Sequence, residues 1–356
     1  MQGKKRLPTV LVISGPKENW YDVCQECADV FTVEQAMWED ISLTSFPDSV
    51  NVTLMPSKYP ISEKQKMKRV ITPSVVLIRM LFRYVGPLGT SNDYRNILYG
   101  FYHAGVTLIN PFYATLCDLD RPIMMGRLRD LQRKLGHDTF PVIPQTYYSD
   151  YTEMVFTPSL PFVVKVSYPH AGYGKMKITQ NDQFQDLKTV VAINNHYSAA
   201  EPLIESEYEV RIAFIAPDYI SAHKRVSQGW KVNHGMPNVR EDIEVTPKYR
   251  MWVEEIRKEF PDMETFSIDT IIGKDGKEYI LETNGSAQGF TPEHKDEALA
   301  KLRDLILSKF QKKENVSAKV SEPPEKEKKE KEDKKDKKEK DKKEKKDKKD
   351  KKKNKK

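Results

Sequence analysis

The last 45 residues of the chain cannot form a hydrophobic core, and this confines the fold to the residues before them. Residues 312–356 contain 23 Lys, 13 Asp or Glu and no aromatic residue. All 17 Tyr, 14 Phe and 4 Trp lie in residues 1–311, which is enough apolar material for two domains or one large α/β unit. The sequence therefore predicts a folded body, followed by a tail that is disordered or a solvated helix.

Charge divides the chain at the same place. Residues 1–311 carry 36 basic and 39 acidic side chains, a net charge of −3, and the tail carries +10. The tail is either a solubilising segment or a polybasic one that binds anionic lipid, filaments or nucleic acid. No specific nucleic-acid binding is expected, because no aromatic side chain in the tail could stack on a base.

The cysteine count and the hydropathy indicate a cytosolic location. The chain has 3 Cys, no signal-peptide pattern, and no apolar run near the ~18 residues of a membrane span. Cys24 and Cys27 form a lone C-x-x-C without a second pair at zinc-ribbon spacing. Two cysteines on one face of a helix are expected there, in preference to a metal or redox site.

The first ~110 residues are predicted to form a parallel α/β domain, because β-branched apolar runs alternate with a helical pattern. A helix is expected over 92–104, closed by Gly105. The predicted strands are 8–15, 50–55, 74–79 and 106–110.

After Arg121 the pattern changes to paired strands with inserted helices, which is typical of an α+β fold. Pro122 and Gly136 are expected to begin and end a helix. The predicted strand pairs are 161–166 with 175–178, 208–215 with 219–226, and 265–272 with 277–283; further helices are expected at 182–195, 247–260 and 293–310. The fold class is therefore α/β plus α+β, with a parallel lobe followed by a larger antiparallel one.

Two features suggest phosphate binding. Lys165 is the one charged residue in an apolar strand, and it either extends its amine to water or points at a phosphate or ring nitrogen. Residues 170–175 contain Gly-x-Gly-Lys between two strands. This is either a plain hairpin or a loop whose backbone approaches a phosphate, but it lacks the spacing of a Walker loop.

A third feature is an acidic hairpin. A turn centred on Asp275-Gly276 would place Asp269 opposite Glu282, with Asn284 on the same face. Facing carboxylates repel unless a cation lies between them, and an all-oxygen set suits Mg²⁺ or Ca²⁺. The alternative is an exposed hairpin with solvated charges.

The order of these features, a Lys, a Gly-rich flap and an Asp…Glu-x-Asn hairpin, resembles the ATP-grasp fold. Residues from about Thr9 to Phe310 are similar to the central domain of the synapsin family. The matching segments are Val76-Leu77-Ile78-Arg79, Asp93-Tyr94-Arg95, Cys117-Asp118, Phe184-Gln185-Asp186, Ala200-Glu201-Pro202, Tyr208-Glu209-Val210-Arg211 and Gly229-Trp230-Lys231. The resemblance implies a leader over 1–8, a pre-ATP-grasp domain over 9–111, a two-lobed ATP-grasp domain over 112–311 and the tail.

Roles follow from the same resemblance. Lys165 would meet the adenine edge and α-phosphate, residues 170–175 would cover the phosphates, 201–204 would pair with adenine, and Glu209 would lie near the ribose. The implied ATP-binding residues are Arg121, Lys165, His170, Ala171, Gly172, Tyr173, Gly174, Lys175, Glu201, Pro202, Leu203, Ile204, Glu209, Lys231 and Asn233; the implied ligands of Ca²⁺ or Mg²⁺ are Asp269, Glu282 and Asn284. The family's Cys-Asp-Lys-Pro stands here as Cys-Asp-Leu-Asp-Arg-Pro over 117–122, so Arg121 replaces a lysine.

The resemblance also implies a function. A synapsin-like protein would bind ATP, lie peripherally on the cytosolic face of synaptic vesicles and regulate their clustering and neurotransmitter release. Vesicle membrane or anionic lipid, actin and further copies of the chain are the implied partners. Only Met1–Pro8 precedes the matching region, so the family's phosphoregulated N-terminal segment is expected to be missing. The family's Pro-rich region is expected to be missing as well, because only Pro323-Pro324 stands in its place.

Two alternatives remain. One is an ATP-grasp ligase that activates a carboxylate as an acyl-phosphate and joins it to an amine, which needs positioning and cations more than a protein nucleophile. The other makes the tail the functional part, with the core as an oligomerising platform.

Overall fold

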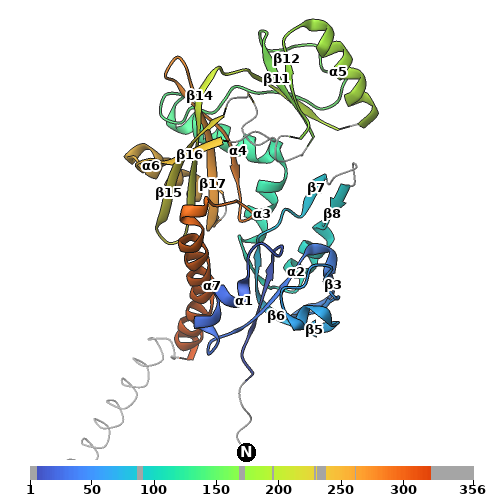
Figure 1. Cartoon of the computed structure of the whole chain (residues 1–356), viewed down its shortest axis with the longest axis vertical. Coiled ribbons are helices and arrows are strands. Elements are labelled where there is room, and N and C mark those ends of the chain that lie inside the picture. Colours follow the sequence, from blue (N-terminus) through green and yellow to red (C-terminus); the bar gives the residue numbers. More distant parts are fainter. Residues whose placement is uncertain are drawn as a thin grey trace, which may run out of the picture. The chain divides into compact units, whose positions relative to one another are not determined.

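A parallel sheet forms the centre of the N-terminal domain, as the sequence predicts (Figure 1). In this computed structural model, which describes residues 6–85, 91–167, 173–194, 196–227, 230, 238–260 and 262–321, the strand order is β2-β1-β6-β9. The strands are β1 (Thr9–Ile13), β2 (Thr32–Ala36), β6 (Pro73–Ile78) and β9 (Thr107–Ile109). Val10, Val12, Val75 and Leu77 are fully buried, which explains their uninterrupted apolar runs.

One predicted strand of this domain belongs to a different sheet. Residues 50–55 form β4 (Ser49–Leu54), which pairs antiparallel with β3 (Ile41–Phe46) and β5 (Arg69–Ile71). Its side chains alternate between buried and exposed, and this alternation marks a half-buried antiparallel strand. The parallel strand β2 was not predicted, because buried Glu34 and Gln35 interrupt its apolar pattern.

Short helices and a hairpin complete the N-terminal domain. The expected helix over 92–104 begins later, at Arg95, because Ser91–Asp93 is a strand. It ends before Gly105, which has φ +66° as a C-terminal glycine requires. The remaining elements are α1 (Trp20–Val23), the 3-10 helices η1 (Gln25–Cys27), η2 (Trp38–Asp40) and η3 (Glu63–Lys66), the strands β7 (Arg83–Val85) and β8 (Ser91–Asp93), and α2 (Arg95–His103).

The cysteine pair is structural. Cys24 follows α1 and Cys27 ends η1, so the two do not share the face of one helix as expected. Both thiols are free and buried, and burial raises the pKa of Cys24 to about 12. Among the described residues, no group of three or more His, Cys, Asp or Glu side chains could hold a metal ion.

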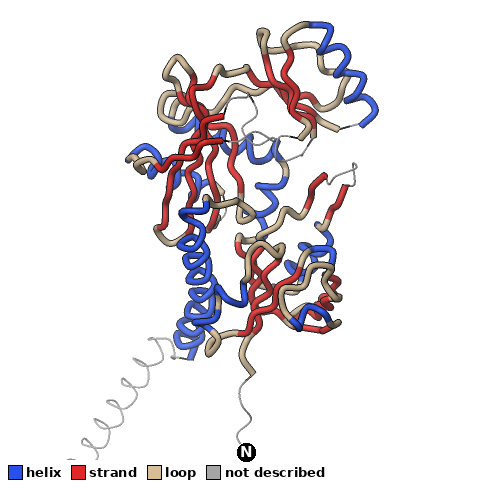
Figure 2. The backbone as a smooth tube through the Cα atoms, in the orientation of Figure 1, coloured by secondary structure: helices blue, strands red, loops and turns tan. Residues whose placement is uncertain are grey.

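The rest of the body contains two antiparallel sheets, and all three predicted strand pairs are confirmed (Figure 2). One sheet has the order β10-β13-β11-β12 and the other β16-β15-β14-β17-β18. The strands are β10 (Thr146–Tyr148), β11 (Phe162–Val166), β12 (Lys175–Ile178), β13 (Ser198–Pro202), β14 (Ser206–Ile215), β15 (Tyr219–Ser227), β16 (Asn238–Asp242), β17 (Thr265–Gly273) and β18 (Glu278–Asn284).

Helices pack against these sheets. The helices are α3 (Phe112–Leu119), α4 (Arg121–Leu135), α5 (Asn181–Asn194), α6 (Pro247–Glu259) and α7 (Pro292–Ser321). Of these, α4, α5 and α6 begin and end within one residue of the predicted bounds, and α3 was not predicted. Gly136 closes α4 with φ +91°, and the Thr246 hydroxyl caps α6 by accepting from the Tyr249 N–H at 3.2 Å. Leu128 of α4 and Trp252 of α6 are fully buried in the core of the five-stranded sheet, with Phe266.

Two buried polar side chains tie the N-terminal domain to the five-stranded sheet. The Asn110 amide donates to the Thr265 carbonyl at 2.7 Å and accepts from the N–H groups of Glu264 and Thr265. Arg79 donates to the carbonyls of Ser286 and Gln288. The path that leads out of β18 is therefore fixed to the N-terminal domain.

Helix α7 begins within the compact unit formed by residues 1–307 and continues beyond it. Ala298, Leu302 and Ile306 are buried, so the predicted amphipathic helix is confirmed. A second unit comprises 308–356, in which the helix extends to Ser321, past the expected end at Phe310. The remaining tail lies outside the described residues, so its predicted state stays a prediction. In the described part of the chain, no helix is long and apolar enough to cross a membrane.

Candidate functional site

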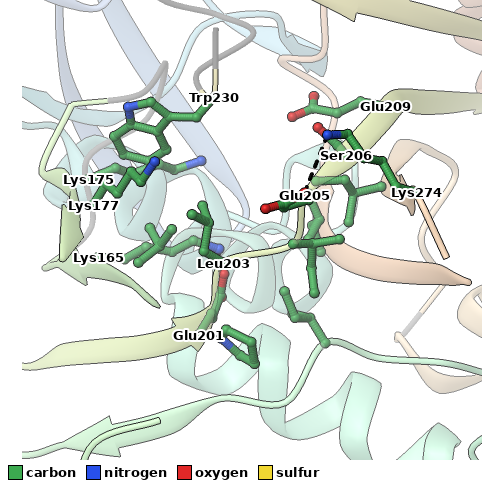
Figure 3. A pocket seen from close by; sticks show the side chains of 16 residues that line it. Lys165, Lys175, Lys177, Glu201, Leu203, Glu205, Ser206, Glu209, Trp230 and Lys274 are labelled. Atoms are coloured by element: carbon green, nitrogen blue, oxygen red, sulfur yellow. Dashed lines mark hydrogen bonds and ion pairs between the residues drawn. The ribbon is translucent and has the colours of Figure 1, made fainter. Parts of the chain in front are cut away.

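A cavity of about 290 Å³ lies between the two antiparallel sheets, β10-β13-β11-β12 and β16-β15-β14-β17-β18 (Figure 3). Many of the predicted site residues line it. Of the predicted residues, it is lined by Lys165, Lys175, Glu201, Pro202, Leu203, Ile204 and Glu209. Lys165 and Lys175 lie on the side formed by β11 and β12, and Glu209 lies on the opposite side, on β14. Segments far apart in the sequence therefore converge on one space.

Lys165 does not extend into bulk water. Only 7% of the residue is exposed, and its Nζ donates to Glu201 Oε1 at 2.6 Å. The Gln145 amide donates to the same oxygen at 2.8 Å. Burial lowers the pKa of Lys165, and Glu201 opposes this effect by stabilising the ammonium. An ammonium held in this way is desolvated, so it can make a strong contact with an anion that enters the cavity.

The structure describes only residues 173–175 of the Gly-rich segment over 170–175. His170, Ala171 and Gly172 lie outside the described residues, as do Lys231 and Asn233. Gly174 has φ +63°, and its carbonyl accepts from the Val166 N–H at 2.8 Å. Lys175 pairs with Lys165 across the β11–β12 ladder, so two cations face the same space. Tyr173 is described but does not line the cavity.

Residues 201–204 connect the two sheets. Glu201 and Pro202 end β13, and β14 begins at Ser206. The Leu203 N–H donates to the Pro161 carbonyl at 3.2 Å, which holds the connection against β11. Glu209, on β14, is paired with Arg225 at 3.0 Å, yet burial raises its pKa.

The hairpin places the two carboxylates as predicted, although its turn differs. Asp269 pairs with Glu282 across β17 and β18. The turn has three residues instead of the expected two, because the Gly273 N–H donates to the Lys277 carbonyl. Gly276, with φ +76°, is its last residue. A bulge at Leu281 adds one residue to β18 and restores the predicted register at the carboxylates.

Arginine side chains, and not solvent, balance the negative charge of these two carboxylates. Asp269 is 5% exposed, which excludes the solvated hairpin. Arg211 donates to both of its oxygens at 2.8 Å, and Arg225 lies 3.4 Å away. Although burial alone would raise it, the two guanidinium groups bring the pKa of Asp269 down to about 2. The Asn284 amide donates to Asp269 at 3.2 Å, so the three predicted cation ligands adjoin one another.

Arg121 lies beside the hairpin and does not line the cavity. Its guanidinium is bonded to Glu282, and this pair is largely buried. Glu282 raises the pKa of Arg121 against the effect of burial. The residue that replaces the family lysine therefore compensates a predicted cation ligand in this structure.

Several lining residues were not predicted. They are Ile143, Val163, Lys177, Glu205, Ser206, Trp230, Ile271, Lys274 and Leu281. The strand period could have indicated Lys177 from Lys175 and Ile271 from Asp269, since residues two apart share a face. Ile143 lies in a loop and Lys274 in a turn, where no strand period indicates which side chains share a face.

The arrangement combines an apolar slot with a cluster of cations and carboxylates. Comparison with known families shows the family of the chain. Residues 3–108 match the synapsin pre-ATP-grasp domain, and residues 110–312 match the synapsin ATP-binding domain. The chain belongs to the synapsin family. It carries the ATP-binding domain of that family, as the sequence motifs indicate.

A synapsin from Drosophila melanogaster is 30% identical over 284 residues, which cover 78% of this chain and 27% of the fly protein. The chain therefore matches about a quarter of that relative's length. The fold also resembles D-cycloserine synthetase DcsG, with a TM-score of 0.58 and 15% identity over 85% of this chain and 99% of the other. The ATP-grasp ligase PsnB, in complex with a phosphomimetic variant of its minimal precursor, Mg and ADP, gives a TM-score of 0.56 and 18% identity over the same shares. These likenesses confirm an ATP-grasp fold.

Proposed function

We propose that this protein binds ATP in the cavity between its two antiparallel sheets. The observation that carries the proposal is the buried Lys165–Glu201 pair at the edge of that cavity, within the region that matches the synapsin ATP-binding domain. A buried ammonium with one carboxylate partner retains donors for a phosphate oxygen. Lys175 adds a second positive charge on the same side.

The lining suits a nucleotide. Val163, Ile271 and Leu281 supply apolar surface for a purine ring. The backbone of 201–204 runs along the cavity, where its polar groups can pair with the adenine edge. Glu209 faces the cavity from β14, at the position that the family resemblance assigns to the ribose.

The hairpin suits a divalent cation. Asp269, Glu282 and Asn284 offer only oxygen ligands, which favours Mg²⁺ or Ca²⁺ over zinc. For these residues to bind a metal, the carboxylates must exchange guanidinium contacts for metal contacts. A bound cation would neutralise charge on the β- and γ-phosphates. Arg121 and Arg211 would then be available to the same phosphates.

At the cellular level, we propose a cytoplasmic protein that associates peripherally with synaptic vesicles and regulates their clustering and neurotransmitter release. Family membership supports this role. Vesicle lipid, actin and further copies of the chain are the proposed partners. The tail, with its net charge of +10, would add attraction to anionic surfaces.

A second candidate is an ATP-grasp ligase that joins a carboxylate to an amine through an acyl-phosphate. The observation that favours it is the position of Asn284, two residues after Glu282 on β18 and next to Asp269, because its amide oxygen would add a third oxygen ligand to a set suited to six-coordinate Mg²⁺. The ligases among the structural neighbours share the fold.

Calorimetric titration of ATP with Mg²⁺, with Ca²⁺ and with neither ion tests the proposal. We expect cation-dependent binding without turnover, and Lys165→Met should weaken it at least ~tenfold by removing a charge-assisted contact. Lys258→Ala, at an exposed site on α6, is the matched control and should bind as the wild type does. Unchanged affinity in Lys165→Met would contradict the proposed site. Release of ADP stimulated by an added carboxylate and amine would instead favour the ligase.

A further inference from the structure

A second cavity, of about 460 Å³, lies where α4, α6, β18 and the loop between α4 and β10 meet. Among the residues that the structure describes, it shares none with the lining of the cavity proposed to bind ATP, hereafter the nucleotide cavity. The two are neighbours, because Val142 and Pro144 line the second cavity while Ile143 lines the nucleotide cavity. The second cavity is large enough for a small molecule of its own.

Prolines and an aromatic ring form the apolar part of this cavity. Pro144 is exposed, and Pro141 and Tyr279 are half-buried, so all three can contact a ligand. Val142 and Trp252, which also line it, are buried. Rigid side chains of this kind lose little conformational entropy when a flat apolar group packs against them.

The buried carboxylate of the cavity, Glu278, is already compensated within the protein. Lys248 Nζ donates to one of its oxygens at 2.5 Å. The hydroxyls of Tyr249 and Thr270 donate to the other oxygen at 3.2 Å and 2.7 Å. Gln132, which is also buried, donates to two carbonyls of the loop. A ligand is therefore selected by the polar groups that remain at the cavity.

Two ammonium groups are available to a ligand. The Lys248 side chain is 49% exposed, and Glu278 uses only one of its three N–H groups. Its Nζ also lies 5.1 Å from the centre of the Trp252 ring, and this contact helps to hold the ammonium in place. The Lys277 side chain is 72% exposed, with an oxygen of Asp275 3.9 Å away.

The charges of the lining favour a ligand with one negative charge. Asp138 is exposed and is the only acid of the described lining besides Glu278. With two lysines against two acids, the lining cannot neutralise a polyanion, but the two ammonium groups match the two oxygens of one carboxylate. His137, also in the lining, can donate a further hydrogen bond.

We propose that the second cavity binds a small organic carboxylate that carries a flat apolar ring. The carboxylate accepts from Lys248 and Lys277, and the ring packs on Pro141, Pro144 and Tyr279. Inorganic phosphate would meet the charges but leave the apolar wall in water, and a neutral ring would leave both ammonium groups without an anion. This site goes beyond the proposed ATP binding and does not depend on it.

Titration calorimetry of the full-length protein with phenylpropionate tests the site. Phenylpropionamide, which has the same shape without the charge, and acetate, which lacks the ring, are the matched probes. We expect phenylpropionate to bind at least ~tenfold more tightly than either, because the charged hydrogen bonds and the buried ring both contribute. Its binding should persist with saturating ATP and Mg²⁺, since the nucleotide cavity is separate.

Variants locate the probe. Lys248→Gln with Lys277→Gln should weaken the binding of phenylpropionate at least ~tenfold. The control is Lys258→Gln with Lys274→Gln, an equal charge change on the same helix and the same hairpin but outside the lining, and it should bind phenylpropionate as the wild type does. Lys277→Gln alone changes an exposed side chain, so a partial loss in that variant excludes misfolding as the cause. Circular dichroism compares the fold of all variants.

Four results would overturn the proposal. Equal binding of phenylpropionate and its amide would mean that the charge is not recognised. Equal binding by the wild type and the Lys248–Lys277 double variant, or displacement by ATP, would mean that the probe binds elsewhere. Absence of phenylpropionate binding to the wild type would refute the site and leave the proposed ATP binding standing, because ATP is titrated separately.

Discussion

Replacing Asp269 by asparagine should destabilise the fold more than any exposed acidic substitution. The side chain is buried, with Arg211 on both oxygens at 2.8 Å and Arg225 at 3.4 Å. Asparagine keeps the shape but leaves two buried guanidinium groups with less negative charge. Breaking a buried ion pair by removing one partner costs about 3–5 kcal/mol.

The lowered pKa of Asp269 gives a second value for the free energy that its arginine contacts contribute to stability. It falls from 3.8 to about 2 on folding, which corresponds to roughly 2 kcal/mol of stability near neutral pH. Because the folded-state pKa is lowered, this contribution is present above pH 4 and is lost as pH falls towards 2. The free energies of unfolding of Asp269→Asn and wild type should therefore differ by about 2–4 kcal/mol at pH 7, and converge below pH 4.

Urea unfolding followed by circular dichroism, without nucleotide and across this pH range, measures the difference. Asp130→Asn, an exposed carboxylate on α4, is the control and should change little. A loss below about 1 kcal/mol at pH 7, or a difference that does not depend on pH, would refute the argument that the arginine contacts stabilise this strand.

Three further predictions concern Asn110, Cys24 and the proposed cation ligands. Asn110→Ala removes three hydrogen bonds to Glu264 and Thr265 and should lower the free energy of unfolding by about 3 kcal/mol in urea titrations. Cys24 should react with a thiol reagent far more slowly in the folded protein than in urea, since a pKa of about 12 leaves roughly one thiolate in ten thousand at pH 8; equal rates would contradict the burial argument. In calorimetry, Mg²⁺ should support ATP binding at least as well as Ca²⁺; Asn284→Val should shift the preference towards Ca²⁺, and Glu282→Ala should weaken binding with either ion. If Asn284→Val leaves the preference unchanged, Asn284 is not a ligand.

In the parallel sheet, the strands made of apolar residues were predictable from the sequence, and β2, which is held by polar contacts, was not. β1, β6 and β9 are apolar runs, as a sheet covered on both faces requires. In β2, Gln35 is buried because its side chain accepts from the Trp20 N–H and donates to the carbonyls of Gly15 and Glu18. Those partners are set by the tertiary fold, so no local pattern indicates that a glutamine can be buried there.

The candidate site, too, was predictable only where local sequence determines it. The facing of Asp269 and Glu282 follows from the period of two in neighbouring strands and a nearby turn, so it could be predicted. The arginines beside them could not, because Arg211 contacts Asp269 through the pairing of β14 with β17, and the two residues are 58 positions apart in the chain. A repulsive pair of carboxylates predicts some cation, but sequence alone does not distinguish a metal ion from a guanidinium.

The bulge at Leu281 separates the length of the turn from the register of the acidic pair. The turn over 274–276 is one residue longer than a two-residue turn, and the bulge absorbs this difference before the carboxylates are reached. The ladder on the far side of the bulge is held by its own contacts, among them the Asn284–Asp269 bond. The turn at the rim of the cavity is held by contacts of its own, such as the bond from the Lys274 N–H to the Glu205 carbonyl, and these are separate from the contacts that hold the acidic pair.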